Sequence, residues 1–183
     1  IDPLLASTYL GGSGYDYTGH ISPFFVGDSF AIDSNGNIYV TGSTRSLDFP
    51  TTPGAYDTVY NNGDVFVSKF NNNLTSLLAA TFLGGSSSEA GHSVVLDLDG
   101  NVYVTGQTSS SDFPTNFIAY DNAYNGNSDV FVSKLEGNLK KLLASTYLGG
   151  SRSDEGNFIA IDQNGNILVS GVTFSLDFPT TEN

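Results

Sequence analysis

Short apolar runs separated by turn sequences rich in Gly, Asn and Asp fill this chain, and no segment shows the periodicity of a helix. In the middle of the chain, HSVVLD at residues 92–97 is mostly apolar, which favours a strand buried on both faces. NVYVTGQT at residues 101–108 alternates in character, as expected of a strand with two unlike faces. DVFVSKL at 129–135 and LLASTYL at 142–148 follow, so the pattern predicts four consecutive strands, A to D.

The same runs recur along the whole chain. Successive Asp-Phe-Pro motifs are 64 and 65 residues apart. Three motifs occur three times each: a strand that ends in Leu-Gly-Gly, a turn and strand that begin Asp-x-x-Gly-Asn, and a Ser-x-Asp-Phe-Pro segment. Their copies span residues 4–12, 77–85 and 142–150, then 33–42, 97–106 and 162–171, then 46–52, 110–116 and 175–181, and Asp-Val-Phe-Val-Ser-Lys occurs twice, within 64–70 and 129–135. A period this regular indicates a repeat architecture.

Four antiparallel strands per repeat are typical of a β-propeller blade. We therefore expect an all-β fold in which residues 1–183 form a single array of four-stranded antiparallel blades. The expected division is a lone outer strand, blade 1, blade 2 and a partial blade 3, at residues 1–12, 13–85, 86–150 and 151–183. This is a partial propeller of about three blades with an incomplete terminal blade, whereas closed propellers typically have four to eight. Such a partial propeller leaves sheet edges unpaired, so we expect it to be completed by other copies of the chain or by the remaining blades of a longer chain.

The recurring motifs resemble those of the SBBP β-propeller repeats of bacteria and archaea. The shared features are the Asp-x-x-Gly-Asn-x-Tyr-Val-Thr-Gly turn and strand, the Ser-x-Asp-Phe-Pro-Thr-Thr segment, the Asp-x-Phe-Val-Ser-Lys strand and the Ser-Thr-Tyr-Leu-Gly-Gly strand end. They occur in the family's order over nearly the whole chain. The resemblance implies a propeller in a secreted or surface-attached protein, without a general catalytic activity, so we expect an extracellular or cell-surface location.

One connection departs from the repeat. Leu10 and Asp33 are 23 residues apart, whereas 14 residues separate the equivalent positions in the other repeats. The insertion, roughly residues 15–27, is expected to join strand D of one blade to strand A of the next, on the face that also carries the long connections 43–63 and 109–128. Long loops on a rigid scaffold often bind ligands. The candidate ligand- or partner-binding residues are the aromatic and histidine side chains of this insertion: Tyr15, Tyr17, His20, Phe24 and Phe25.

The tight turns between strands A and B carry the candidate metal ligands. They place carboxylate and amide oxygens at alternate positions, as the first half of a calcium loop does. An EF-hand loop that begins at Asp97 would need Gly at position 102 and Glu at position 108, where this chain has Val102 and Thr108, so that geometry is excluded. Hairpin turns closed by side-chain hydrogen bonds are the favoured interpretation, and Ca²⁺ shared between turns is the alternative. The candidate ligands are Asp33, Asn35, Asn37, Asp97, Asp99, Asn101, Asp162, Asn164 and Asn166.

Composition narrows the classes of partner. Six Lys and Arg against 19 Asp and Glu give a formal charge of −13, which disfavours nucleic acids and anionic membrane surfaces. The chain has no Cys, so disulfides and thiolate metal sites are excluded. No apolar run approaches the roughly 20 residues that span a bilayer, so direct membrane insertion is not expected.

These observations favour a non-enzymatic function. The two histidines, His20 and His92, occupy different positions in the repeat, and no nucleophile motif accompanies them. The leading hypothesis is an extracellular structural or interaction module that self-assembles into a ring or filament through blade or strand completion between chains. The alternative is a propeller that binds carbohydrate or peptide through the long aromatic loops. A hydrolase or lyase with His92 as its base is a third, weaker hypothesis.

Overall fold

The computed structural model describes residues 5–19 and 28–181, and within these residues all regular secondary structure is β-strand. No helix in the described ranges has the length and apolarity needed to cross a membrane. The strands form three antiparallel sheets with the orders β1-β3-β4-β5 (β2 also pairs with β3), β6-β7-β8-β9 and β10-β11. Their bounds are β1 Asp16–Thr18, β2 Phe30–Ile32, β3 Ile38–Thr44, β4 Asp64–Phe70, β5 Leu77–Leu83, β6 Glu89–Leu96, β7 Val102–Thr108, β8 Asp129–Leu135, β9 Leu142–Leu148, β10 Asp154–Ile161 and β11 Ile167–Thr173.

The second sheet is a complete four-stranded blade, which confirms the predicted fold class. Strands β8 and β9 have the bounds that the hydrophobic pattern predicts. Strand β6 begins at Glu89, three residues before the predicted start of strand A. Its register with β7 shifts between Gly91 and Ser93, so His92 forms a β-bulge. The corresponding shift in the third sheet falls between Gly156 and Phe158.

The insertion in the first repeat lies within strand A. Strand β1 pairs with residues 42–44 of β3, and β2 pairs with residues 38–40 of the same strand, so β1 and β2 are two halves of one strand A. The prediction that residues 15–27 connect strand D to strand A was therefore wrong. The pairing of strand A with β3 is interrupted between Thr18 and Phe30, the position at which the other two blades have their bulge. Because a bulge residue is already unpaired, extra residues at this point leave the ladder intact on both sides.

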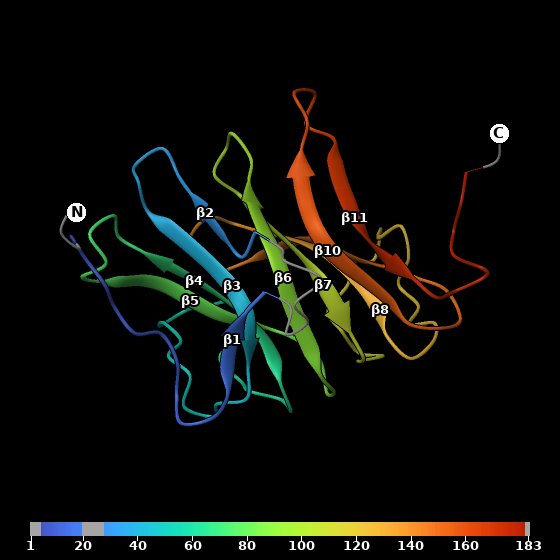
Figure 1. Cartoon of the computed structure of the whole chain (residues 1–183), viewed down its shortest axis with the longest axis horizontal. Coiled ribbons are helices and arrows are strands. Elements are labelled where there is room, and N and C mark those ends of the chain that lie inside the picture. Colours follow the sequence, from blue (N-terminus) through green and yellow to red (C-terminus); the bar gives the residue numbers. More distant parts are fainter. Residues whose placement is uncertain (1–4, 20–27, 182–183) are drawn as a thin grey trace.

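The three sheets lie side by side in the order of the sequence, and the two-stranded third sheet is at the end of the array opposite the first (Figure 1). Adjacent blades make contact mainly through their A and B strands. The apolar core between the first two sheets is built from both of them, chiefly Tyr39, Val65, Val67, Leu83, Val94, Val102, Val104 and Leu135.

The connections gather at two opposite edges of the array, as the alternation of strands predicts. At one edge, the turn after each D strand contacts the segment after the next B strand, for example through the bond from Ser86 N to Asp112 Oδ1 at 2.8 Å. At the other edge, the A–B and C–D turns meet, and the Tyr39 hydroxyl donates to the Gly137 carbonyl at 3.0 Å. At the first edge, the Asp of each Asp-Phe-Pro motif accepts hydrogen bonds that join these two connections.

Residues 5–12 belong to no strand of the described chain. Residues 5–10 nevertheless have the same sequence, LASTYL, as residues 143–148 of β9. Tyr9 is fully exposed, whereas the equivalent Tyr147 is 1 % exposed. Residues 5–10 thus have the sequence of strand D without a sheet to pair with, and the lone outer strand stays a prediction.

Candidate functional site at the open edge of the third blade

In each complete blade, a phenylalanine ring of strand C lies over a glycine of strand B, and we call this arrangement the aromatic seat. In the second blade, the ring of Phe131 in β8 lies over Gly106 of β7, where an added Cβ would come within 3.0 Å of Cε1. Phe113 of the Asp-Phe-Pro motif packs on this ring with centroids 4.8 Å apart, and Tyr147 of β9 lies 6.1 Å from Phe113. The glycine is needed because any side chain there would meet the ring and the neighbouring strand.

The first blade repeats this arrangement. Gly42 of β3 lies under the ring of Phe66, whose Cε1 and Cζ are 2.9 Å from the position of an added Cβ. Phe49 stacks on Phe66 with centroids 4.6 Å apart. The seat is therefore a regular feature of a complete blade in this chain.

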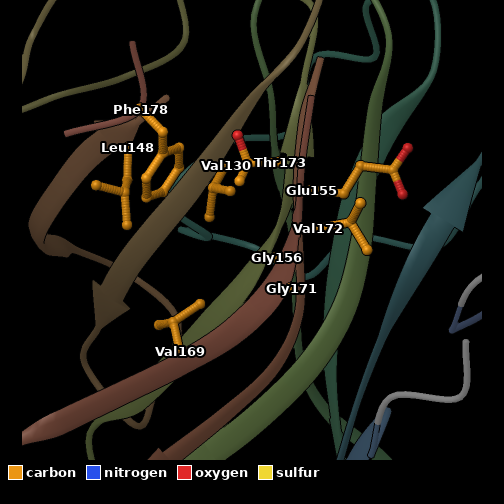
Figure 2. A pocket seen from close by; sticks show the side chains of 9 residues that line it. All are labelled: Val130, Leu148, Glu155, Gly156, Val169, Gly171, Val172, Thr173 and Phe178. Carbon is orange, nitrogen blue, oxygen red and sulfur yellow. The ribbon is translucent and has the colours of Figure 1, made fainter. Parts of the chain in front are cut away.

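The third blade has the seat without the ring. Gly171 of β11 and Phe178 correspond to the glycine and the Asp-Phe-Pro phenylalanine, but the described residues place no aromatic ring over Gly171. A cavity of about 180 Å³ takes its place, and Figure 2 shows Phe178 beside Leu148 and Val130 at one side of it. Phe178 is half-buried, whereas Phe113 is 3 % exposed.

A lysine of strand C forms an ion pair with the A–B turn in each of the first two blades, and the described residues contain no such pair in the third blade. Lys69 Nζ lies 3.3 Å from Asp33 Oδ2, and Lys134 Nζ lies 3.1 Å from Asp97 Oδ2. Both lysines belong to strand C. Within the described part of the chain, the equivalent Asp162 makes no ion pair, although hydrogen bonds from Asn166 hold the pKa of its carboxyl below the ordinary value.

Buried carboxylates lie at both blade junctions. Glu89 begins β6, is 2 % exposed, and accepts hydrogen bonds from the Ser110 and Thr108 hydroxyls at 2.5 and 2.8 Å. Burial still raises the pKa of Glu89. Burial also raises the pKa of Asp64 to about 7 and that of Asp129 to about 6, with added repulsion from the carboxylate that begins the next blade. The sequence pattern contains no sign of these acids, because their burial depends on strands far away in the chain.

The predicted aromatic site is only partly within the described residues. Tyr15 is 79 % exposed immediately before β1, and Tyr17 is half-buried within β1. His20, Phe24 and Phe25 lie outside the described residues. Beside Tyr17, a cavity of about 590 Å³ is also lined by Leu10 and Phe70, on the outer side of the first blade.

The candidate calcium ligands form hairpin turns. Asp97 Oδ1 accepts hydrogen bonds from the backbone amides of Asp99 and Asn101 at 3.0 and 2.8 Å, and Oδ2 accepts from Asn101 Nδ2 at 2.8 Å. The turns at Asp33 and Asp162 repeat these bonds. Across residues 5–19 and 28–181, no three acidic or histidine side chains are grouped to hold a metal ion. These contacts favour the structural interpretation, and Ca²⁺ binding stays a prediction.

His92, the candidate base, is a packing residue of the junction between the second and third blades. It is 1 % exposed, and its Nδ1 lies 3.0 Å from the Gly156 carbonyl of the next blade. A ring held in this way links two neighbouring A strands at the bulge and is closed to solvent.

Three neighbouring antiparallel sheets, two of them with a layer of packed aromatic rings, define an array of β-propeller blades. The sequence profile of the SBBP β-propeller repeat matches residues 26–50, 81–114 and 145–179, and the chain belongs to this family. A comparison with curated proteins found no match.

Proposed function

We propose that the chain is a non-enzymatic structural or interaction module that assembles outside the cell or at its surface by completing blades between copies. The observation that carries this proposal is the open edge of β11, where the described residues leave the aromatic seat over Gly171 unfilled and Asp162 without an ion pair. Unpaired strand edges of this kind are templates for another strand. The family resemblance supports the extracellular part of this proposal.

The other end of the chain offers a strand that suits such an edge. In the second blade, the Tyr147 hydroxyl of β9 donates to the Ser110 carbonyl at 2.8 Å, while its ring packs near Phe113. Tyr9 has the same sequence context and no such partner within the described residues. We infer that residues 5–10 of one copy take the strand D position in the third blade of another copy. To complete that blade, a strand C must also lie between β11 and these residues. Joining of this kind is head-to-tail and yields a ring or a filament.

The experiment compares the native masses of two variants by light scattering. Tyr9→Ser removes the ring that would enter the partner blade, and we expect it to shift the chain toward the monomer. Leu98→Ser is the matched control, because Leu98 is a fully exposed apolar residue in the A–B turn of the complete second blade. Equal masses for Tyr9→Ser, Leu98→Ser and the unmodified chain would contradict this role of residues 5–10.

A second candidate function is carbohydrate or peptide binding on the outer side of the first blade. The cavity beside Tyr17 favours it, because its lining combines the aromatic residues Tyr17, Phe66 and Phe70 with the polar residues Thr8 and Thr18. Saturable binding in a glycan or peptide panel that Tyr17→Ala abolishes would support this function. Binding that Tyr17→Ala leaves unchanged would exclude this cavity.

A further inference from the structure

We propose that each junction between neighbouring blades is a pH-sensitive joint, in which the acid that begins strand C of one blade holds a proton against the acid that begins strand A of the next. The two pairs are Asp64 with Glu89 and Asp129 with Asp154. Loss of the proton leaves two buried carboxylates side by side and loosens the contact between the blades. The inference does not depend on self-assembly, because both junctions lie within one copy of the chain.

The two acids of the first pair lie against one glycine of the turn between the blades. A Cβ added to Gly84 would overlap both Asp64 Oδ1 and Glu89 Oε2, so these two oxygens are at most about 5 Å apart. Asp64 is 1 % exposed and Glu89 is 2 % exposed, and Asp64 Oδ1 has no hydrogen-bond partner in the described residues. Two negative charges this close and this deeply buried repel each other strongly.

The second junction repeats the arrangement. A Cβ added to Gly149 would overlap Asp129 Oδ1. The amide of the next residue, Gly150, donates to Asp154 Oδ2 at 2.8 Å. Oδ1 of Asp129 and Oδ1 of Asp154 both lack a hydrogen-bond partner in the part of the chain that the structure describes, and both side chains are fully buried. A buried acid pair with an unpartnered oxygen therefore recurs at both junctions.

The two acids of each pair differ in their hydrogen-bond donors. Glu89 accepts hydrogen bonds from two hydroxyls and from the Gly85 amide, whereas Asp64 accepts one, from the Asn61 amide. At the second junction, the strand A acid again has two donors and the strand C acid has one. Hydrogen bonds to a carboxylate favour its ionised form, so the strand A acid keeps its charge and the strand C acid takes the proton.

The surroundings of the pairs offer no compensating positive charge from a side chain. Among the described residues, no lysine or arginine forms an ion pair with any of the four acids. Burial and the neighbouring carboxylates raise the pKa of Asp64 to about 7 and that of Asp129 to about 6. The other titratable groups that face the pairs are acids or tyrosines: Asp57, Asp112, Asp121, Tyr124 and Tyr147.

A backbone hydrogen bond beside each pair reports the state of the joint. The Glu89 amide donates to the Gly63 carbonyl at 2.8 Å, and the Asp154 amide donates to the Ser128 carbonyl at 2.8 Å. Each bond joins the start of a strand A to the segment before strand C of the preceding blade. Because the folded pKa values are raised, these bonds are tight at acidic pH and weaken as the pH rises through about 7 at the first junction and about 6 at the second.

Hydrogen–deuterium exchange of the full chain at pH 5 and pH 8 tests the joint, with each rate divided by that of an unstructured peptide at the same pH. Between pH 5 and pH 8, we expect protection of the Glu89 amide to fall at least tenfold and that of the Asp154 amide to fall several-fold. The Val104 amide, in the middle of β7, is the control and should change less than twofold. Unchanged protection of the Glu89 and Asp154 amides would overturn the inference.

Two single variants separate the junctions, and each is the matched control for the other. Asp64→Asn should abolish the pH dependence at the Glu89 amide and leave that at the Asp154 amide unchanged. Asp129→Asn should do the reverse. Thermal melts establish that both variants fold. Variants that alter both amides equally, or neither, would contradict a joint that acts locally at each junction.

Infrared spectroscopy of the unmodified chain detects the protons directly, without relying on any variant. Ordinary carboxyl groups are ionised at pH 6, so a protonated-carboxyl band at this pH reports the raised acids. We expect such a band at pH 6, its loss by pH 8, and a weaker band in Asp64→Asn. A chain without this band at pH 6 would overturn the inference, whatever its oligomeric state.

Discussion

Asp64→Asn should stabilise the protein at alkaline pH and have a clearly smaller effect at acidic pH. Asp64 begins β4 and is 1 % exposed. Its Oδ2 accepts a hydrogen bond from the Asn61 amide at 2.9 Å, and its Oδ1 has no hydrogen-bond partner in the described residues. A Cβ built on Gly84 would overlap both Asp64 Oδ1 and Glu89 Oε2, so the two carboxylates lie against the same glycine.

The magnitude follows from the shift in the pKa of Asp64. Burial raises this pKa from 3.8 to about 7, and the folded state therefore holds a proton that the unfolded state releases. The resulting stabilisation is fully present below about pH 4 and is lost as the pH rises through about 7. About three pKa units at about 1.4 kcal/mol each set a ceiling of about 4 kcal/mol.

An asparagine at position 64 removes most of this pH dependence. Its carbonyl can accept from the Asn61 amide as Oδ2 does, and its Nδ2 puts a neutral group in place of the unpartnered Oδ1, which removes the repulsion from Glu89. We expect Asp64→Asn to raise the free energy of unfolding by about 2 kcal/mol at pH 8 and by less than half as much at pH 5, which lies only about one unit above the pKa in the unfolded state.

Urea denaturation of the unmodified chain and the variant at pH 5 and pH 8 measures these differences. Asp99→Asn is the matched control, because Asp99 is exposed and Asn stands at the equivalent positions 35 and 164. A variant destabilised equally at both pH values would contradict the proposed protonation of Asp64 in the folded state. An unmodified chain that became more stable between pH 5 and pH 8 would contradict it as well.

Three further predictions concern the repeated features. Gly106→Ala should destabilise the fold by about 3 kcal/mol in urea denaturation, because the added Cβ would overlap the Ala90 carbonyl; an effect below about 1 kcal/mol would contradict the close approach. Asp112→Asn should lower the free energy of unfolding by about 1 kcal/mol by weakening the bonds from Ser86 N and Oγ at 2.8 and 3.0 Å, and a neutral result would show that this tie is dispensable. Millimolar CaCl₂ or a chelator should leave the melting temperature unchanged, since the turn carboxylates are engaged by their own amides; a clear rise with calcium would identify the turns as ligands.

Much of the fold is predictable from local sequence. The bounds of β8 and β9 follow from hydrophobic alternation and the turn residues that flank them. The start of β6 does not, because Glu89 is a charged residue whose burial depends on the hydroxyls of Thr108 and Ser110 from later in the chain. The position of the insertion could not be predicted either, since a bulge is defined by the partner strand.

The candidate site was likewise predictable from the sequence only in part. The repeat identifies Phe178 as a counterpart of Phe113, and it identifies Gly171 as a counterpart of Gly106. That these two positions share one aromatic seat becomes visible only when Phe131 is placed over Gly106. Sequence motifs therefore locate the components of the edge, whereas packing between strands shows how they form one site.

The most direct test of self-assembly by blade completion is the native mass of the chain over a range of concentrations. Light scattering with negative-stain imaging in parallel provides it. Blade completion between copies predicts a mass well above 19.3 kDa, with rings or filaments in the images and dissociation on dilution. A particle of 19.3 kDa that stays monomeric at every concentration would contradict blade completion between copies.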